Sequence, residues 1–257
     1  MALALNTLVA GTPTALPPLL IAHGLFGSGR NWGMLSKKLA ADREVIAVDM
    51  RNHGDSPWDA AHDYEAMAGD LAGVIEAHGG RAAVLGHSMG GKAAMVLALS
   101  RPELVERLIV VDVAPIAYTH DQMANITAMR AVDLSAVKRR ADAEAGLAAH
   151  VEDPALRAFF LQNLRLTPEG ASWRLNLDVL ADEMPRILGF PDLAGPYPGP
   201  TLFLTGALSG YVRPENHARI AALFPAVRFE TIAGAGHWVH AEAPGPFLEA
   251  VARFLAA

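Results

Sequence analysis

The sequence predicts one α/β domain: a doubly wound, mostly parallel sheet with a helical segment inserted into it. Short apolar runs alternate with helical patterns, and most of these runs show no strict polar–apolar alternation. Strands that are covered by helices on both faces have this composition, which is typical of parallel sheets. The alternation of strands and helices stops between about residues 115 and 200, which indicates the insertion.

Six apolar runs are the candidate strands, and each ends in turn residues. They span 19–24, 45–50, 82–87, 108–113, 201–206 and 227–232. Apolar residues line one face of 31–41 and of 64–78, so these segments are expected to be helices. A third helix is expected over 90–100, closed by Pro102. Pro214 is expected to open a further helix, because its missing N–H is harmless in a first turn, and a last helix follows Pro246.

Residues 115–199 show helical stretches but no clear strand, and they are too many for a bare loop. We expect them to form a helical cap between the two parts of an α/β core, 1–114 and 200–257. In doubly wound folds, ligands bind at the carboxyl ends of the strands. The cap is therefore expected to lie over that edge.

Composition limits the classes of function. The chain has 257 residues, of which 52% are hydrophobic, and this allows a large core. Its formal net charge of −6 gives no electrostatic reason to expect nucleic acid or an anionic membrane as a partner. There is no cysteine, which excludes disulfides, thiolate catalysis and cysteine metal sites.

The first residues are apolar but have no basic residue before them, unlike a signal peptide, and no apolar run reaches the length of a membrane span. We therefore expect a cytoplasmic protein. With no coiled-coil pattern, a monomer and a homodimer are both compatible with the sequence.

The stretch LGHSMGGK at 85–92 places Ser88 between a predicted strand and a predicted helix, flanked by Gly86 and Gly90. In this setting a G-x-S-x-G serine lies on a strained turn that exposes its hydroxyl group. The glycines are expected because backbone segments pass close to the turn. The alternative is a capping serine in a glycine-rich turn, but the position between strand and helix favours a nucleophile.

A nucleophilic serine needs a base, and the base needs an acid that orients it. Among ten histidines, His237 follows the last strand and a flexible GAG segment, so we predict it as the base. His240 is expected to be structural, His23 a hydrogen-bonded loop anchor and His53 part of a turn, while His87 is expected to point elsewhere. The remaining histidines lie in polar stretches and are expected to be solvated: His62, His78, His120, His150 and His217.

The acid usually lies between nucleophile and base in the chain. Of the two strand ends in that interval, the first supplies Asp112, which we predict as the acid. The alternative for Asp112 is a loop aspartate that caps the turn before Pro115. The second strand end supplies no acid before Glu215 and carries Ser209 instead. Glu215 is the rival, but it falls in the first turn of the helix that Pro214 opens.

An oxyanion needs two backbone N–H donors. We expect one from Met89, next to the serine, and one from Leu25, with Phe26 as the alternative. Several apolar side chains are candidates for an acyl pocket, although core packing would also explain them. These candidates are Phe26, Phe159, Trp173, Tyr211 and Trp238.

Five stretches together resemble the α/β-hydrolase fold: HGLFGS, DMRNHGDS, GHSMGGK, VVDVAP and AGAGHWVHAE. More closely, they resemble the YbfF-type bacterial esterases and their mitochondrial abhydrolase-domain relatives. The resemblance extends from about residue 18 to the end and includes FFLQNL and WRLNL within the insertion.

The resemblance implies a serine esterase of short-to-medium acyl esters, with acyl thioesters as a further class, that works through an acyl-enzyme without a metal or cofactor. It places the nucleophile on Ser88, the base on His237 and the acid on Asp112. In the wider fold the acid usually stands where this chain has Ser209. Ser209 would then support the base by a hydrogen bond.

Other functions fit the same pattern, because the fold alone does not fix the reaction. A carbon–carbon bond hydrolase or lyase and a cofactor-free perhydrolase would use the same three residues. A non-catalytic ligand receptor on a hydrolase scaffold is a different class, and the intact serine–histidine pair argues against it.

Overall fold

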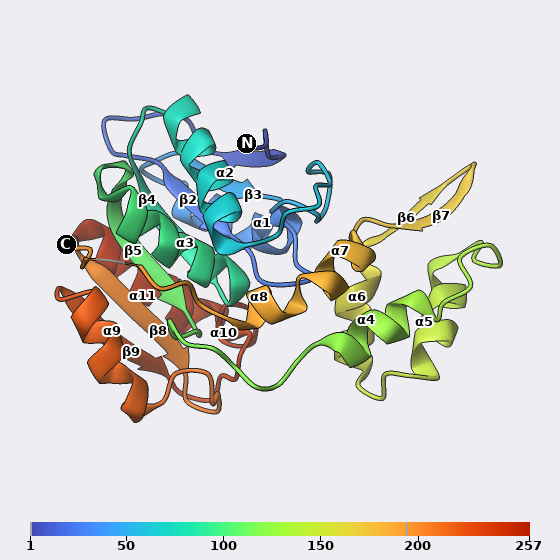
Figure 1. Ribbon diagram of the computed structural model, residues 1–257. Coiled ribbons are helices and arrows are strands. Elements are labelled where there is room, and N and C mark those ends of the chain that lie inside the picture. Colours follow the sequence, from blue (N-terminus) through green and yellow to red (C-terminus); the bar gives the residue numbers. More distant parts are fainter. Residues whose placement is uncertain (1, 194) are drawn as a thin grey trace.

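The computed structural model describes residues 2–193 and 195–257 (Figure 1). Its centre is a seven-stranded sheet in the order β1-β3-β2-β4-β5-β8-β9. Only β1 runs antiparallel to its neighbour, so the prediction of a mostly parallel sheet is confirmed. The strands are β1 (Thr7–Ala10), β2 (Leu19–Ala22), β3 (Val45–Val48), β4 (Ala82–His87), β5 (Val105–Val111), β8 (Thr201–Gly206) and β9 (Val227–Ile232).

The strands are apolar without alternation because both faces of the sheet are buried. In β2, Leu20 and Ala22 belong to one hydrophobic core, whereas Leu19 and Ile21 belong to a second core on the other face. The sequence did not predict β1, because this strand lies half-exposed at the edge of the sheet and lacks an apolar run of the same kind.

Helices cover both faces of the sheet. The first core takes in side chains of α2 (Tyr64–Ala77), α3 (Met89–Ser100) and α9 (His217–Leu223). The second takes in those of α1 (Gly33–Leu39) and α11 (Pro244–Ala256). Pro214 opens a short 3₁₀ helix (Pro214–Asn216) that leads into α9, and the last helix begins two residues before Pro246.

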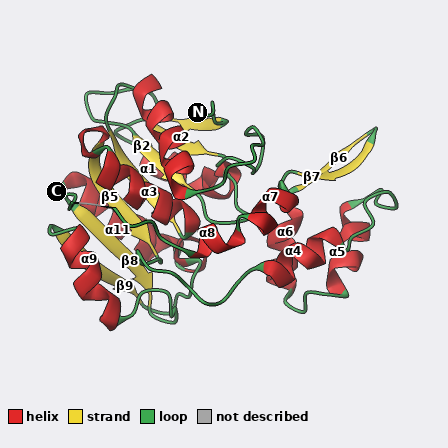
Figure 2. Cartoon of the chain, in the orientation of Figure 1, coloured by secondary structure: helices red, strands yellow, loops and turns green. Residues whose placement is uncertain are grey.

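The insertion lies between β5 and β8, and we call residues 115–199 the cap, a division that stays a prediction. It contains α4 (Met123–Arg130), α5 (Arg140–Ala148), α6 (Pro154–Leu161), α7 (Leu177–Asp182) and α8 (Met184–Leu188). The expectation that it has no strand is wrong. A hairpin of β6 (Leu164–Thr167) and β7 (Gly170–Trp173) lies at its outer edge (Figure 2). These strands are short and largely exposed, so they lack an apolar run.

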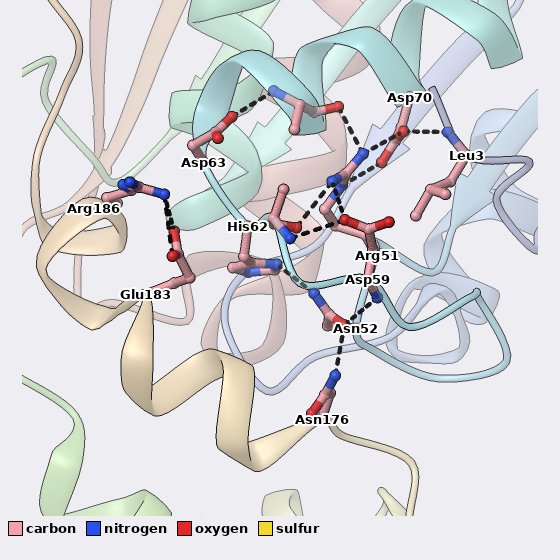
Figure 3. Close-up of polar contacts among 12 residues, drawn as sticks. Leu3, Arg51, Asn52, Asp59, His62, Asp63, Asp70, Asn176, Glu183 and Arg186 are labelled. Atoms are coloured by element: carbon pink, nitrogen blue, oxygen red, sulfur yellow. Dashed lines mark hydrogen bonds and ion pairs between the residues drawn. The ribbon is translucent and has the colours of Figure 1, made fainter. Parts of the chain in front are cut away.

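The loop after β3 is held by a buried ion pair that Figure 3 shows in detail. The guanidinium of Arg51 binds both carboxylate oxygens of Asp70 on α2, at 2.7 and 2.8 Å. Arg51 also donates to the carbonyls of Ala61 and Ala66, while Asp70 accepts from the amide of Leu3. Such bidentate geometry and additional hydrogen bonds offset the cost of burying two charges.

His62 lies in the same region, and the expectation that it is solvated is wrong. Its ring is fully buried, and its Nδ1 lies 3.2 Å from the side-chain nitrogen of Asn52. The polar residues around His62 in the sequence did not indicate that its ring is buried, because neighbouring residues of a loop can face opposite ways. Burial, together with the charge of Arg51, lowers the pKa of His62 to about 3.

Among the described residues, no helix combines the length and the apolar character that crossing a membrane requires.

His62 should make the protein less stable in acid. Its folded pKa is about 3 and its unfolded pKa about 6.5, so the unfolded chain binds the extra proton between these values. The stabilisation is complete above pH 6.5 and is lost as pH falls toward 3. Between pH 7 and 5, the free energy of unfolding should drop about 2 kcal/mol less in His62→Gln than in the wild type. Urea titrations at both pH values measure this; equal drops in the two proteins would contradict it.

Candidate active site

Ser88 lies on a strained turn between β4 and α3. Its backbone angles are φ 52° and ψ −119°, a conformation that residues with side chains rarely adopt. A Cβ on Gly86 would lie 2.2 Å from the carbonyl oxygen of Gly90, and a Cβ on Gly90 would lie 2.4 Å from that of Ala22. The expectation that close backbone segments require both glycines is confirmed.

Asp112 and His237 meet in space. Asp112 follows β5 with φ 53° and is fully buried, and its Oδ2 lies 2.7 Å from Nδ1 of His237, in the segment after β9. Donation from Nδ1 to the carboxylate leaves the Nε2 lone pair available to accept a proton. The rival Glu215 is exposed on the surface beside Arg213.

Ser209 acts on the acid rather than on the base. Its hydroxyl donates to Oδ2 of Asp112 at 2.5 Å, and the amide of Gly206 donates to Oδ1 at 3.2 Å. The expected hydrogen bond from Ser209 to the base is therefore replaced by one to Asp112. Ser209 and Gly206 orient the carboxylate, which in turn orients the imidazole.

Ser88 and His237 line the same cavity, which has a volume of about 910 Å³ and lies between the core and the cap. Of the predicted pocket residues, Phe26, Phe159, Tyr211 and Trp238 also line it. The prediction for Trp173 is wrong. Trp173 packs inside the cap, where its indole N–H donates to the carbonyl of Met129 at 3.0 Å and so satisfies its polar atom.

Tyr211 is also a direct neighbour of the predicted base. Its ring stacks on the imidazole of His237, with ring centroids 3.9 Å apart and planes inclined by 17°. The Tyr211 hydroxyl lies 2.9 Å from Nε2 of His120. His120 is exposed, as expected, but it lines the cavity, a position that its polar sequence neighbours did not indicate.

Two further histidines surround the base without adding charge. Nε2 of His87 lies 2.9 Å from the backbone carbonyl of His237, and burial holds the pKa of His87 well below its usual value. His240 stacks on Trp32, with centroids 4.2 Å apart, and burial lowers the pKa of His240 to about 3. Both rings are therefore neutral near pH 7. The structural role expected for His240 agrees with this burial.

The loop 24–31 carries the predicted oxyanion donor. The amide of Phe26 donates to Nε2 of His53 at 3.2 Å, so it is already used. Within the described residues, the amide of Leu25 has no hydrogen-bond acceptor. Leu25 thus stays our candidate, together with Met89 at the first position of α3. His23 anchors the loop as expected, through Gly24 and the amide of Met50.

Lys92 is buried and lines the cavity, although the sequence did not predict it as a site residue. Its ammonium group donates to the carbonyls of Leu188 and Gly189, at 2.8 and 2.6 Å, and so ties α3 to the end of α8. Burial lowers the pKa of Lys92 to about 7. The available signal was its place in the first turn of the helix that follows Ser88, because this turn lies next to the nucleophile.

Across the described ranges, no cluster of three or more histidine, aspartate or glutamate side chains has the arrangement of a metal site.

A serine on a strand-to-helix turn, with an aspartate–imidazole pair in the same cavity at the carboxyl ends of parallel strands, defines the class of α/β hydrolases. The comparisons agree: residues 17–244 match the family described as alpha/beta hydrolase fold, and the chain belongs to this family.

Two relatives and one solved structure are especially similar. The chain is 46% identical over 252 residues to the mouse sn-1-specific diacylglycerol lipase ABHD11, an alignment that covers 94% of this chain and 81% of the relative. It is 39% identical over 242 residues to the Escherichia coli K12 esterase YbfF, covering 93% and 92%. A marine microorganism esterase has a TM-score of 0.94 and 34% identity, covering 98% of this chain and 100% of that one. The protein is a carboxylic ester hydrolase related to the abhydrolase-domain proteins.

The two glycines of the turn give a direct test of its geometry. Gly90→Ala should lower the free energy of unfolding by about 3 kcal/mol and reduce activity, because the new methyl group collides with the backbone of β2. Gly33→Ala is the matched control: its Cβ meets nothing within 4 Å, so it should be neutral or stabilise α1 by about 0.5 kcal/mol. Thermal and urea unfolding measure both. Equal effects of the two substitutions would contradict the close packing at Gly90.

Proposed function

We propose that the protein hydrolyses short-to-medium acyl esters through an acyl-enzyme on Ser88. The observation that carries this proposal is the hydrogen bond between buried Asp112 and His237, in a cavity that Ser88 also lines. An unactivated serine hydroxyl is a weak nucleophile, and a neighbouring oriented imidazole is the usual way to activate it.

In the proposed mechanism, Oγ of Ser88 attacks the ester carbonyl while Nε2 of His237 takes the proton from the Ser88 hydroxyl. Asp112 holds the imidazole in the required tautomer and stabilises its cationic form. The amides of Leu25 and Met89 donate to the oxyanion of the tetrahedral intermediate, and Met89 also benefits from the positive end of the α3 dipole. His237 then protonates the leaving alcohol, and water, activated by the same base, releases the acid.

The residues of the cavity wall support the proposal that the enzyme selects its substrates mainly by their acyl chain. Part of this wall is apolar and consists of Phe160 from α6 and Met184, Ile187 and Leu188 from α8. A volume of about 910 Å³ leaves room for chains longer than acetate. The names of the relatives, an esterase and a diacylglycerol lipase, agree with ester substrates. Acyl thioesters form the same kind of tetrahedral intermediate, so we include them in the proposed range.

Removing the hydroxyl of Ser88 should abolish turnover of p-nitrophenyl butyrate without unfolding the chain. Ser88→Ala should lower kcat roughly 10,000-fold or more, and Asp112→Asn should have a comparable effect because it favours the wrong tautomer of His237. Ser100→Ala is the control, since Ser100 lies at the other end of α3 and its hydroxyl bonds only carbonyls of that helix. Normal turnover by Ser88→Ala would contradict the proposal.

The acyl-chain preference should depend on α8. Met184→Trp adds bulk to the apolar part of the cavity wall, so kcat/KM for p-nitrophenyl octanoate should fall at least 10-fold relative to the acetate ester. Leu166→Trp is the control, because Leu166 is exposed on the hairpin β6–β7 and should leave the series unchanged. If Met184→Trp leaves the dependence of kcat/KM on acyl-chain length unchanged, the acyl chain does not bind against α8 and this prediction is wrong. The acetate rate reports whether the variant is folded.

A further inference from the structure

The cap contacts the loop that carries the proposed oxyanion donor. FFLQNL ends with Gln162, Asn163 and Leu164, and Asn163 is buried between cap and core. The side-chain amide of Asn163 donates to the backbone carbonyl of Phe26 at 2.8 Å. Its neighbour Gln162 accepts from the side-chain amide of Asn31, in the same loop. Two consecutive cap residues therefore bind the loop 24–31.

This loop is held in a strained conformation that needs such support. Phe26 has φ 62°, which is unfavourable for an aromatic residue and persists only where the surroundings fix it. From the core, His53 accepts from the Phe26 amide, and the Nδ1 of His53 in turn lies 2.8 Å from the carbonyl of Arg51. From the cap, Asn163 binds the Phe26 carbonyl. One hydrogen bond on each side thus fixes this residue.

A second contact between cap and core provides a natural comparison. Asn176, from the stretch WRLNL, donates to the side-chain oxygen and to the backbone carbonyl of Asn52, both at 3.0 Å (Figure 3). Asn52 also has a positive φ of 63°, and its side chain continues to His62. Asn176 therefore docks the cap on the loop after β3 without contacting Phe26.

We propose that Asn163 is a positioning residue for the oxyanion hole: by holding the Phe26 carbonyl, it aims the free amide of Leu25, one residue earlier, at the developing oxyanion. The Leu25 amide and the Phe26 carbonyl lie in different peptide planes, which are joined through the backbone angles of Leu25 and Phe26. Release of the Phe26 carbonyl therefore allows the strained angles at Phe26 to relax, and the Leu25 amide rotates with them. The cap then contributes to catalysis and not only to the walls of the pocket. This inference rests on the proposed acyl-transfer function.

The test uses a substrate pair that isolates the oxyanion. In p-nitrophenyl thionobutyrate a sulfur atom replaces the carbonyl oxygen, and sulfur is larger and accepts hydrogen bonds poorly. The ratio of kcat/KM for the oxygen ester to that for the thiono ester measures how much the amide donors contribute. Asn163→Ala should lower kcat for the oxygen ester about 10- to 100-fold with little change in KM, and should lower the oxygen-to-sulfur ratio at least 5-fold.

Asn176→Ala is the matched control. It removes a partly buried side-chain hydrogen bond between cap and core and should reduce thermal stability, yet leave the oxygen-to-sulfur ratio unchanged. Asn163→Leu provides a second variant of nearly the same size, whose apolar side chain has no N–H to donate. It should reproduce the fall of the ratio if Asn163→Ala fails to fold.

An unchanged ratio in folded Asn163 variants, or an equal change in Asn176→Ala, would overturn the inference and reduce Asn163 to a docking residue. Other results would contradict the proposed acyl-transfer function itself. In that case Ser88→Ala retains turnover, or the wild-type enzyme shows no preference for the oxygen ester.

Discussion

The hydrogen bond between Nδ1 of His237 and the buried Oδ2 of Asp112 joins two segments that lie 125 positions apart in the chain. The sheet order makes this contact possible, because β4, β5, β8 and β9 are consecutive neighbours. Their carboxyl ends therefore carry Ser88, Asp112, the support from Gly206 and Ser209, and the segment to His237. Low exposure strengthens the pair, since the carboxylate has fixed donors in place of water.

Strain concentrates at the carboxyl edge of the sheet. The four non-glycine residues with positive φ among the described residues are Phe26, Asn52, Ser88 and Asp112. Two belong to the proposed triad, and the other two are the points where Asn163 and Asn176 of the cap bind the core. Such conformations persist only when packing and hydrogen bonds fix them. The cap, through these contacts, supports the loops beneath it as well as enclosing the cavity.

The sequence predicted the sheet, apart from its edge strand β1, and the main helices that cover it, because an apolar run and a helical period are local signals. It also predicted the positions of Ser88, Asp112 and His237 that the structure brings to one edge, since they follow strand ends. Trp173 and His62 were misjudged, and the position of His120 at the cavity was not predicted, because the direction of a side chain depends on tertiary packing, which the neighbouring residues do not reveal. The same holds for Lys92 and Asn163, whose partners lie far away in the chain. The hairpin was missed because its strands are short and exposed.

Covalent labelling tests most directly whether Ser88 is activated by this arrangement. Wild-type protein is treated with a fluorophosphonate, digested, and mapped by mass spectrometry. The account predicts one adduct, on the peptide that contains Ser88, and loss of labelling in His237→Ala while the fold is retained. Labelling at another residue, or an undiminished rate of labelling at Ser88 without the imidazole of His237, would contradict it.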